Sequence, residues 1–128
     1  MLVRLLYASR AVDTGAGAIE TILAQSRQYN PTCGITGILC YGGGIFLQAI
    51  EGGRMAVNEL YGHIQKDPRH TQVTVVHQGP LDKRRFWNFS LGYTSAEDIE
   101  ALERLRQLQG QPAVDAFVAL ISGLDVEG

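Results

Sequence analysis

The chain has 128 residues, 45% of them hydrophobic, which is enough to bury the core of one globular domain. Its net charge of −2 gives no overall basic field for binding nucleic acid, and the short cluster Lys83-Arg84-Arg85 is interpreted as a solvated turn. No apolar stretch approaches the ~20 residues that span a bilayer, and Cys33 and Cys40 lack CxxC spacing, so we expect a cytoplasmic protein with no structural disulfide.

The first half of the chain predicts a strand, a helix and a hairpin. Residues 1–9 alternate with apolar side chains on both faces, as in an interior strand. Asp13 and Thr14 offer cap oxygens to a helix that the pair Asn30-Pro31 is expected to end. Residues 36–41 and 45–51 then predict two antiparallel strands joined by a tight glycine turn. The helix carries one stripe with helical spacing: Ile19, Ile22, Leu23 and Ser26.

The second half predicts a helix, two strands and two further helices. A helix after Gly52-Gly53 is expected to end at Asp67-Pro68, followed by a strand over 72–78 and a turn at Gly79-Pro80. A short fifth strand is expected over 89–93. Two amphipathic helices follow, the first capped by Ser95 and the second beginning at Pro112.

This order predicts an α+β fold, a ferredoxin-like βαββαββ sheet with two helices on one face. The two C-terminal helices are expected to cover the other face. We divide the chain into a core at 1–94 and a C-terminal helical cap at 95–128, which packs on the sheet, mediates self-association, or does both.

Several motifs that would indicate other chemistry are incomplete. His63, His70 and His77 recur every seven residues but fall on different elements, so no metal site is expected. The run Gly42-Gly43-Gly44 lacks the GK[ST] ending of a phosphate loop, and Ser9 has no nucleophile elbow around it. A hydrolase is therefore disfavoured.

Gln48 is a polar residue inside an otherwise apolar strand. An amide left unpaired in a core costs about 1–3 kcal/mol, so a polar partner is required. The first and third strands are expected to be neighbours, which would bring Tyr7 to Gln48 beneath the two helices. From the residues alone both a structural hydrogen bond and a ligand site remain open, and the structural bond is favoured.

Four separated segments form a specific pattern: Leu-Leu-Tyr-Ala-Ser near the N-terminus, the glycine-rich stretch 30–52, Asp67-Pro-Arg-His70, and the segment 85–92 with its Arg-Phe and Ser-Leu-Gly. In order and spacing these segments resemble the signature of the BLUF family, blue-light sensors that use FAD. The resemblance covers about residues 2–93 and would make the core a flavin-binding photosensor.

The resemblance implies a non-covalently bound FAD, with FMN or riboflavin as alternatives. Tyr7 would donate an electron and a proton through Gln48, which would rearrange its hydrogen bonds to the flavin C4=O and N5. Asn30 would hold the polar edge of the ring, and Arg69 and His70 would lie near the ribityl end. The implied flavin-binding residues are Tyr7, Ile22, Leu23, Ser26, Asn30, Gln48, Arg69 and His70.

The resemblance also implies a photoreceptor that turns over no substrate. Its signal would pass through the fifth strand, expected beside Gln48, and the C-terminal helices to a separate partner protein. Phe89 and Leu91 stand where many members carry Trp and Met, so the relay and the dark recovery are expected to differ. A homo-oligomer is also expected, and neither nucleic acid nor a membrane is an expected partner.

Two alternatives belong to other functional classes. One is a small ferredoxin-like enzyme of the acylphosphatase type, for which Arg10 follows the first strand but the glycine-rich anion cradle is missing. The other is a binding module that keeps the fold without a pigment.

Overall fold

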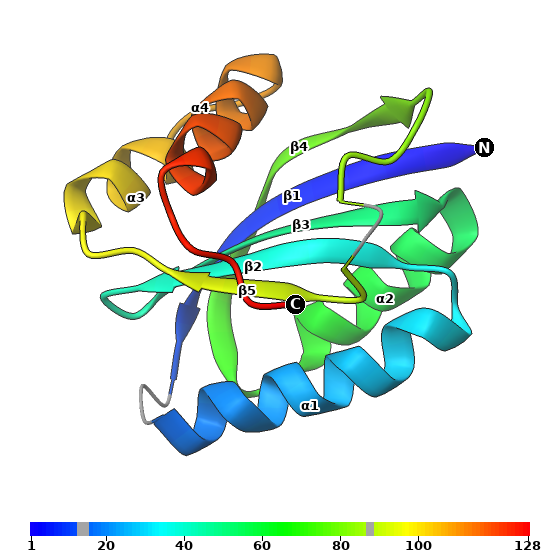
Figure 1. The fold of residues 1–128 in the computed structure, drawn as a ribbon, viewed down its shortest axis with the longest axis horizontal. Helices are drawn as coiled ribbons and strands as arrows, with labels where there is room; N and C mark the ends of the chain where they lie inside the picture. The colour runs from blue at the N-terminus through cyan, green and yellow to red at the C-terminus, as the bar shows by residue number, and fades with distance from the viewer. Residues whose placement is uncertain (13–15, 87–88) are drawn as a thin grey trace.

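In the computed structural model, five strands form one sheet that lies between two pairs of helices (Figure 1). The structure describes residues 1–12, 16–86 and 89–128. Within them the strands are β1 (Leu2–Ala11), β2 (Thr36–Gly42), β3 (Ile45–Gly53), β4 (His70–Leu81) and β5 (Gly92–Ser95). The helices are α1 (Ala16–Thr32), α2 (Arg54–Lys66), α3 (Ile99–Arg106) and α4 (Gln111–Ser122).

The strand order across the sheet is β4-β1-β3-β2-β5. The first four strands pair antiparallel, and β5 pairs parallel to β2. The β2–β3 hairpin turns on Gly43 and Gly44, whose φ values of 56° and 80° are in the left-handed region that glycine adopts without strain. This arrangement confirms the predicted α+β ferredoxin-like fold.

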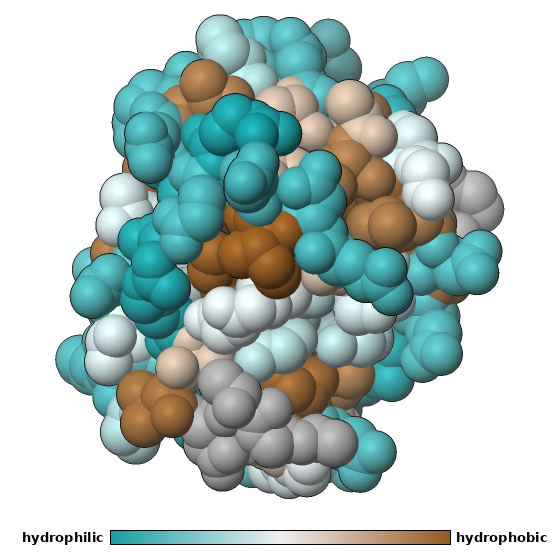
Figure 2. All heavy atoms as spheres, turned by 90° about the vertical axis from the view of Figure 1, so that its left-hand side faces the viewer, coloured by the Kyte–Doolittle hydropathy of each residue, from teal (hydrophilic) through white to brown (hydrophobic). Residues whose placement is uncertain are grey.

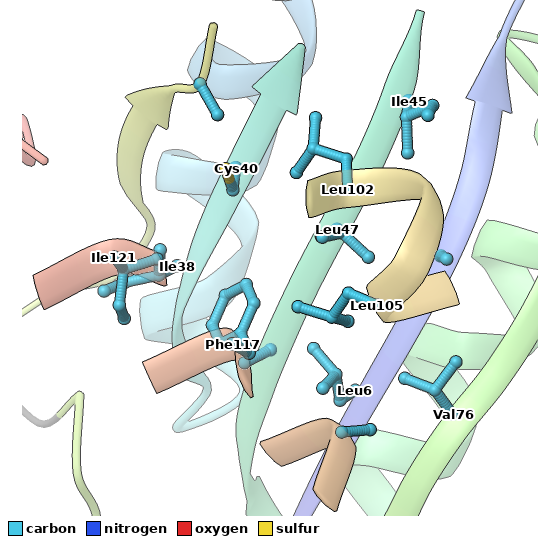
Figure 3. Packing of buried hydrophobic residues seen from close by; sticks show 14 of the residues in the cluster. Leu6, Ile38, Cys40, Ile45, Leu47, Val76, Leu102, Leu105, Phe117 and Ile121 are labelled. Carbon is cyan, nitrogen blue, oxygen red and sulfur yellow. The ribbon is translucent and has the colours of Figure 1, made fainter. Parts of the chain in front are cut away.

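Alternation along the strands gives the sheet two apolar faces. Leu6 and Leu47 point to the face covered by α3 and α4, where Leu102, Leu105 and Phe117 pack on them (Figure 3). The odd-numbered residues of β1, with Tyr7 among them, point to the opposite face beneath α1 and α2. The C-terminal helices therefore cover the second face, as predicted.

Two predictions about the fifth strand were wrong. β5 begins at Gly92, so Phe89 and Leu91 precede it. The strand does not lie beside Gln48 either, because β2 lies between β3 and β5. A Cβ on Gly92 would come within 2.9 Å of Val126 Cγ1, so a larger residue where β5 begins would force neighbouring side chains to shift.

Several predicted element ends also differ. α1 continues through Pro31 to Thr32, because a proline in the last turn removes only one helical hydrogen bond, and Cys33 and Ile35 both donate to the Asn30 carbonyl. Pro80 lies within β4 rather than in a turn, which an edge strand tolerates. Asp98, not Ser95, caps α3 by accepting from the Ala101 amide. The predicted caps Asp13 and Thr14 lie outside the described residues.

Hydrophobic residues on the side shown in Figure 2 gather in small patches separated by hydrophilic ones. The large hydrophobic side chains most exposed over the described residues are Met1, Val12, Met55 and Ile99. In the described part of the chain, none of the helices combines the length and hydropathy needed to cross a membrane.

Candidate functional site

A cavity of about 300 Å³ opens between α1, α2 and the sheet. Its volume is at the lower end of the range for small-molecule sites. Most of the residues predicted from the sequence line it: Tyr7, Ile22, Ser26, Asn30, Gln48, Arg69 and His70. Leu23 does not line it but is buried in the neighbouring apolar cluster with Leu39 and Phe46.

Tyr7 and Gln48 lie directly opposite each other on β1 and β3, at the sheet surface under the cavity. The Tyr7 hydroxyl donates a hydrogen bond to Gln48 Oε1, and both side chains are buried. Burial raises the pKa of Tyr7 well above its ordinary value, and the negative charge of Asp67 and the nearby Tyr61 raise it further. The phenol is therefore a neutral donor, and Gln48 Nε2 is left to donate to a ligand.

Asn30 connects the cavity wall to the segment before β5. It lies in the last turns of α1 with 1% of its surface exposed, and its Nδ2 donates to the Ser90 carbonyl at 2.6 Å. An amide carries two N–H donors and one acceptor oxygen. Asn30 thus has a second hydrogen and Oδ1 with which to pair a ligand that has both a donor and an acceptor.

Arg69 stands at the outer end of the cavity, held by other side chains. Its Nε and Nη2 bind the carboxylate of Asp67 at 2.9 and 2.5 Å, and its Nη1 donates to Gln25 Oε1 at 2.6 Å. The guanidinium holds the pKa of Asp67 below its usual range, so the carboxylate stays ionised. The positive charge of Arg69 is thus already paired within the chain.

His70 is fixed by hydrogen bonds on both sides of its ring. Its Nε2 lies 2.7 Å from the Ile64 carbonyl, which can only accept, and its Nδ1 lies 2.9 Å from the Ser9 hydroxyl. In a neutral ring, Nε2 therefore carries the hydrogen and Ser9 donates to Nδ1. The ring stands edge-on to Tyr7 and Phe46, so it forms a rigid part of the wall.

Phe89 and Leu91 are not lining residues of the cavity. Leu91 is fully buried with Leu39 and Phe46, which do line it, so it lies directly behind the wall. Phe89 packs instead against the cluster on the α3 and α4 side. Arg27 donates to the Leu91 carbonyl at 3.0 Å and to the Glu127 carbonyl at 3.2 Å, tying this segment to the last residues of the chain. Trp87 lies outside the described residues.

Reasoning from sequence missed a large part of the lining. Leu60 and Ile64 of α2 were assigned no site role, and His63 was considered only as a metal ligand. One usable signal was that α2 places positions 60, 63 and 64 on one face at spacing i, i+3, i+4. The lining residues not assigned from the sequence are Gln25, Tyr29, Leu39, Phe46, Leu60, His63, Ile64 and Asp67.

The cavity suits a largely apolar ligand with a polar edge. Apolar and aromatic side chains form most of its walls, and the amides of Asn30 and Gln48 provide buried donors and acceptors. Asp67 and Arg69 form a charged pair at the lining that is neutral overall. Over residues 1–12, 16–86 and 89–128, no group of three His, Cys, Asp or Glu side chains could hold a metal ion.

Comparisons with known proteins agree with this geometry. Residues 2–92 match the model of a family described as BLUF, sensors of blue-light using FAD. A Euglena gracilis protein named photoactivated adenylate cyclase subunit beta-like protein FB is 32% identical over 114 residues, 88% of this chain and 13% of that protein. The blue light- and temperature-regulated antirepressor BluF of Escherichia coli is 32% identical over 87 residues, 67% of this chain and 22% of that protein. The chain thus spans less than a quarter of either relative.

Solved structures resemble the chain over nearly its whole length. The dark-state structure of BlrB, a BLUF protein, has a TM-score of 0.81 and 38% identity, and the match covers 95% of this chain and 96% of that one. The photo-activated state of BlsA has a TM-score of 0.80 and 27% identity, with 93% of each chain covered. A bacterial light-regulated adenylyl cyclase matches with a TM-score of 0.73 and 26% identity, over 96% of this chain and 34% of that chain.

Proposed function

Because the chain belongs to the BLUF family of blue-light sensors that use FAD, we propose that it is a photoreceptor in which Gln48 is the switch and Tyr7 its proton-donating partner. The observation that carries the proposal is the Tyr7–Gln48 hydrogen bond at the base of the cavity. The proposed role is reversible sensing without substrate turnover.

The residues of the cavity fit a flavin ring. An isoalloxazine is flat, with a polar edge that offers both a donor and acceptors. Asn30 has Oδ1 and a second amide hydrogen for this edge, and Gln48 Nε2 has a hydrogen for a ring acceptor. Ile22 and Phe46 supply apolar wall, and Arg69 and His70 lie on the lining. FMN and riboflavin share this ring, so the lining favours no one of the three.

The protein's part in the chemistry is to control the proton of the Tyr7 phenol and the orientation of the Gln48 amide. Bound FAD supplies light absorption and redox reactivity. The Tyr7 phenol is buried and neutral, so it gives up an electron readily only where its proton can leave at the same time. Its O–H points at Gln48 Oε1, which makes the amide the path for that proton.

Gln48 can act as a switch because the Tyr7 hydroxyl can form a hydrogen bond with either orientation of the amide. The phenolic O–H donates to Oε1 in the arrangement described here, and the phenolic oxygen can accept from Nε2 after a flip of the amide. A flip that also moves one amide hydrogen from Nε2 to Oε1, giving the imidic-acid tautomer, would turn that O–H toward the cavity and leave the nitrogen to accept from Tyr7. A new donor toward the flavin C4=O would shift the absorption to the red.

Leu91 and Asn30 are the proposed route out of the cavity. Asn30 contacts the cavity and holds the Ser90 carbonyl, while Leu91 lies directly behind Leu39 and Phe46. A change at Gln48 would thus reach the segment before β5 through the wall rather than through a neighbouring strand. We propose that this segment, Phe89 and the helical cap at 95–128 pass the signal to a separate partner protein. Self-association of the chain and a cytoplasmic location remain predictions.

One absorption experiment tests the proposal. The purified protein, loaded with FAD, should show a flavin band that moves to the red under blue light and returns in the dark. A protein that takes up no flavin on reconstitution, or a band that stays unmoved by light, would refute the photoreceptor function.

A further inference from the structure

A second groove lies on the sheet face opposite the cavity. It has a volume of about 470 Å³ and runs between the segment after β4 and the side of α4. Lys83, Arg84 and Arg85 form one wall, and Arg4 of β1 contributes from the sheet. The cluster that the sequence indicated to be a solvated turn is therefore one side of a shaped surface.

Arg84 fastens this wall to the body of the protein. Its Nη1 donates to Thr36 Oγ1 and to the Glu51 carbonyl, each at 3.0 Å, and its Nη2 donates to the Gly34 carbonyl at 2.7 Å. An arginine exposed in a solvated turn would be hydrated by water and would not form three hydrogen bonds with other parts of the chain. Lys83 and Arg85, on either side of it, stay exposed.

Glu51 holds the same segment from beneath. Its carboxylate is fully buried, accepts from the backbone N–H groups of Arg85 and Phe86 at 2.9 Å, and pairs with Arg4 at 2.9 Å. These contacts fix the backbone from which Lys83 and Arg85 project. A surface ordered before binding loses less conformational entropy when a partner docks.

The groove is positively charged although the chain is negative overall. Its four cations, Arg4, Lys83, Arg84 and Arg85, meet two carboxylates, Glu51 beneath them and Asp115 on α4, which leaves a local charge of +2 against −2 for the whole chain. Opposite the basic wall, α4 presents a short apolar strip of Val118 and Ala119, to which the largely buried Val114 adds little surface. A fitting partner therefore carries acidic side chains beside apolar ones.

We infer that the groove between Lys83–Arg85 and α4 is the docking surface for an acidic, partly apolar peptide segment of a partner protein. The ordered basic wall supplies the attraction and the orientation, and the apolar strip on α4 gives contact area. This inference rests on the proposed function only in its biological role, as the surface where the signalling partner sits. The binding itself requires neither light nor flavin chemistry.

Binding of an acidic probe in the dark tests the inference. The probe is a peptide of alternating glutamate and leucine pairs that carries a dye excited by red light, outside the flavin band, and its binding to the full chain with flavin is measured by fluorescence anisotropy. We expect it to bind, to bind more weakly as ionic strength rises, and to outcompete the same peptide with glutamine in place of glutamate.

Charge reversal in the wall provides the decisive comparison. Lys83→Glu/Arg85→Glu should weaken binding at least about tenfold, or about 1.4 kcal/mol, since two exposed attractions become repulsions. The control Arg54→Glu/Arg104→Glu makes the same change of net charge at exposed positions outside the groove, and it should keep the wild-type affinity. Far-UV circular dichroism and the flavin band establish that each variant is folded.

Three outcomes would overturn the inference. They are no binding of the acidic peptide, equal loss in the two double variants, and tighter binding of a labelled single-stranded oligonucleotide than of the peptide at the same salt concentration. None of these outcomes alters the light-induced band shift, so a failure here is distinct from a failure of the proposed photoreceptor function.

Discussion

The Tyr7 hydroxyl and the Gln48 amide oxygen meet in a buried hydrogen bond between β1 and β3, at the base of the cavity. The bond satisfies both groups within the protein and leaves Gln48 Nε2 for a ligand. Gln48 thus connects Tyr7 on β1 with the flavin ring that would lie in the cavity.

Replacing Gln48 with leucine should separate flavin binding from switching. Gln48→Leu keeps a side chain of similar size, so flavin should still bind, but the red shift under blue light should be abolished. The Tyr7 hydroxyl loses its acceptor, which should lower the free energy of unfolding by about 1–3 kcal/mol. Absorption spectra and urea unfolding measure the two effects.

Gln25 supplies the matched control for this experiment. It also lines the cavity, but it pairs with Arg69 rather than with Tyr7. Gln25→Leu should keep the red shift, and an intact shift in Gln48→Leu would refute the assigned switch.

Tyr7 should make the protein less stable in alkali. Burial raises its pKa, so the folded protein keeps the phenol proton above about pH 10, where the unfolded chain loses it. The folded state then binds more protons than the unfolded state. The free energy of unfolding should therefore fall as the pH rises above about 10, by up to about 1.4 kcal/mol per pH unit from this residue.

Tyr7→Phe should reduce that alkaline slope by the same amount, as measured by urea unfolding at a series of pH values. Other tyrosines contribute slopes of their own, among them Tyr29, whose pKa a hydrogen bond with Cys33 raises to about 12. The difference between the two proteins is therefore the quantity to compare. Equal slopes would show that Tyr7 titrates as if exposed.

Changing Leu91 should alter the rate of dark recovery but not the size of the red shift. The side chain is fully buried behind Leu39 and Phe46 and does not reach the cavity. Leu91→Met conserves volume and should cost less than about 1.5 kcal/mol of stability. The size of the red shift should stay as in wild type, while the rate of dark recovery changes. A changed shift with an unchanged rate would contradict the proposed relay.

Glu51 should be among the most sensitive positions for stability. Glu51→Ala removes a buried carboxylate and leaves Arg4 and two backbone N–H groups without their acceptor, which should cost about 3–5 kcal/mol in urea unfolding. Glu100→Ala removes an exposed glutamate that lies 3.9 Å from Arg104, and it should change stability by no more than about 0.5 kcal/mol. Similar losses in the two variants would mean that the buried contacts contribute little.

The meeting of Tyr7 and Gln48 was predictable because strand alternation gives each residue a face and the element order makes β1 and β3 neighbours. The place of β5 was not predictable in the same way. Its four residues contain no signal for their neighbour, because the parallel partner strand, β2 at Thr36–Gly42, lies far earlier in the chain. Arg84 was misread for a related reason, since the acceptors of its three hydrogen bonds lie 33 to 50 residues away in the chain.

The position of β2 between β3 and β5 has a consequence for how such a sensor can be tuned. The pair that would set the absorption spectrum sits on the central strands, whereas the segment that would report it is one strand further out and is reached through Asn30 and the cavity wall. Mutations could then lengthen or shorten the lifetime of the lit state without changing which light is absorbed. The absorption spectrum and the time for which the protein stays in the lit state would be adjustable as two separate properties of one small protein.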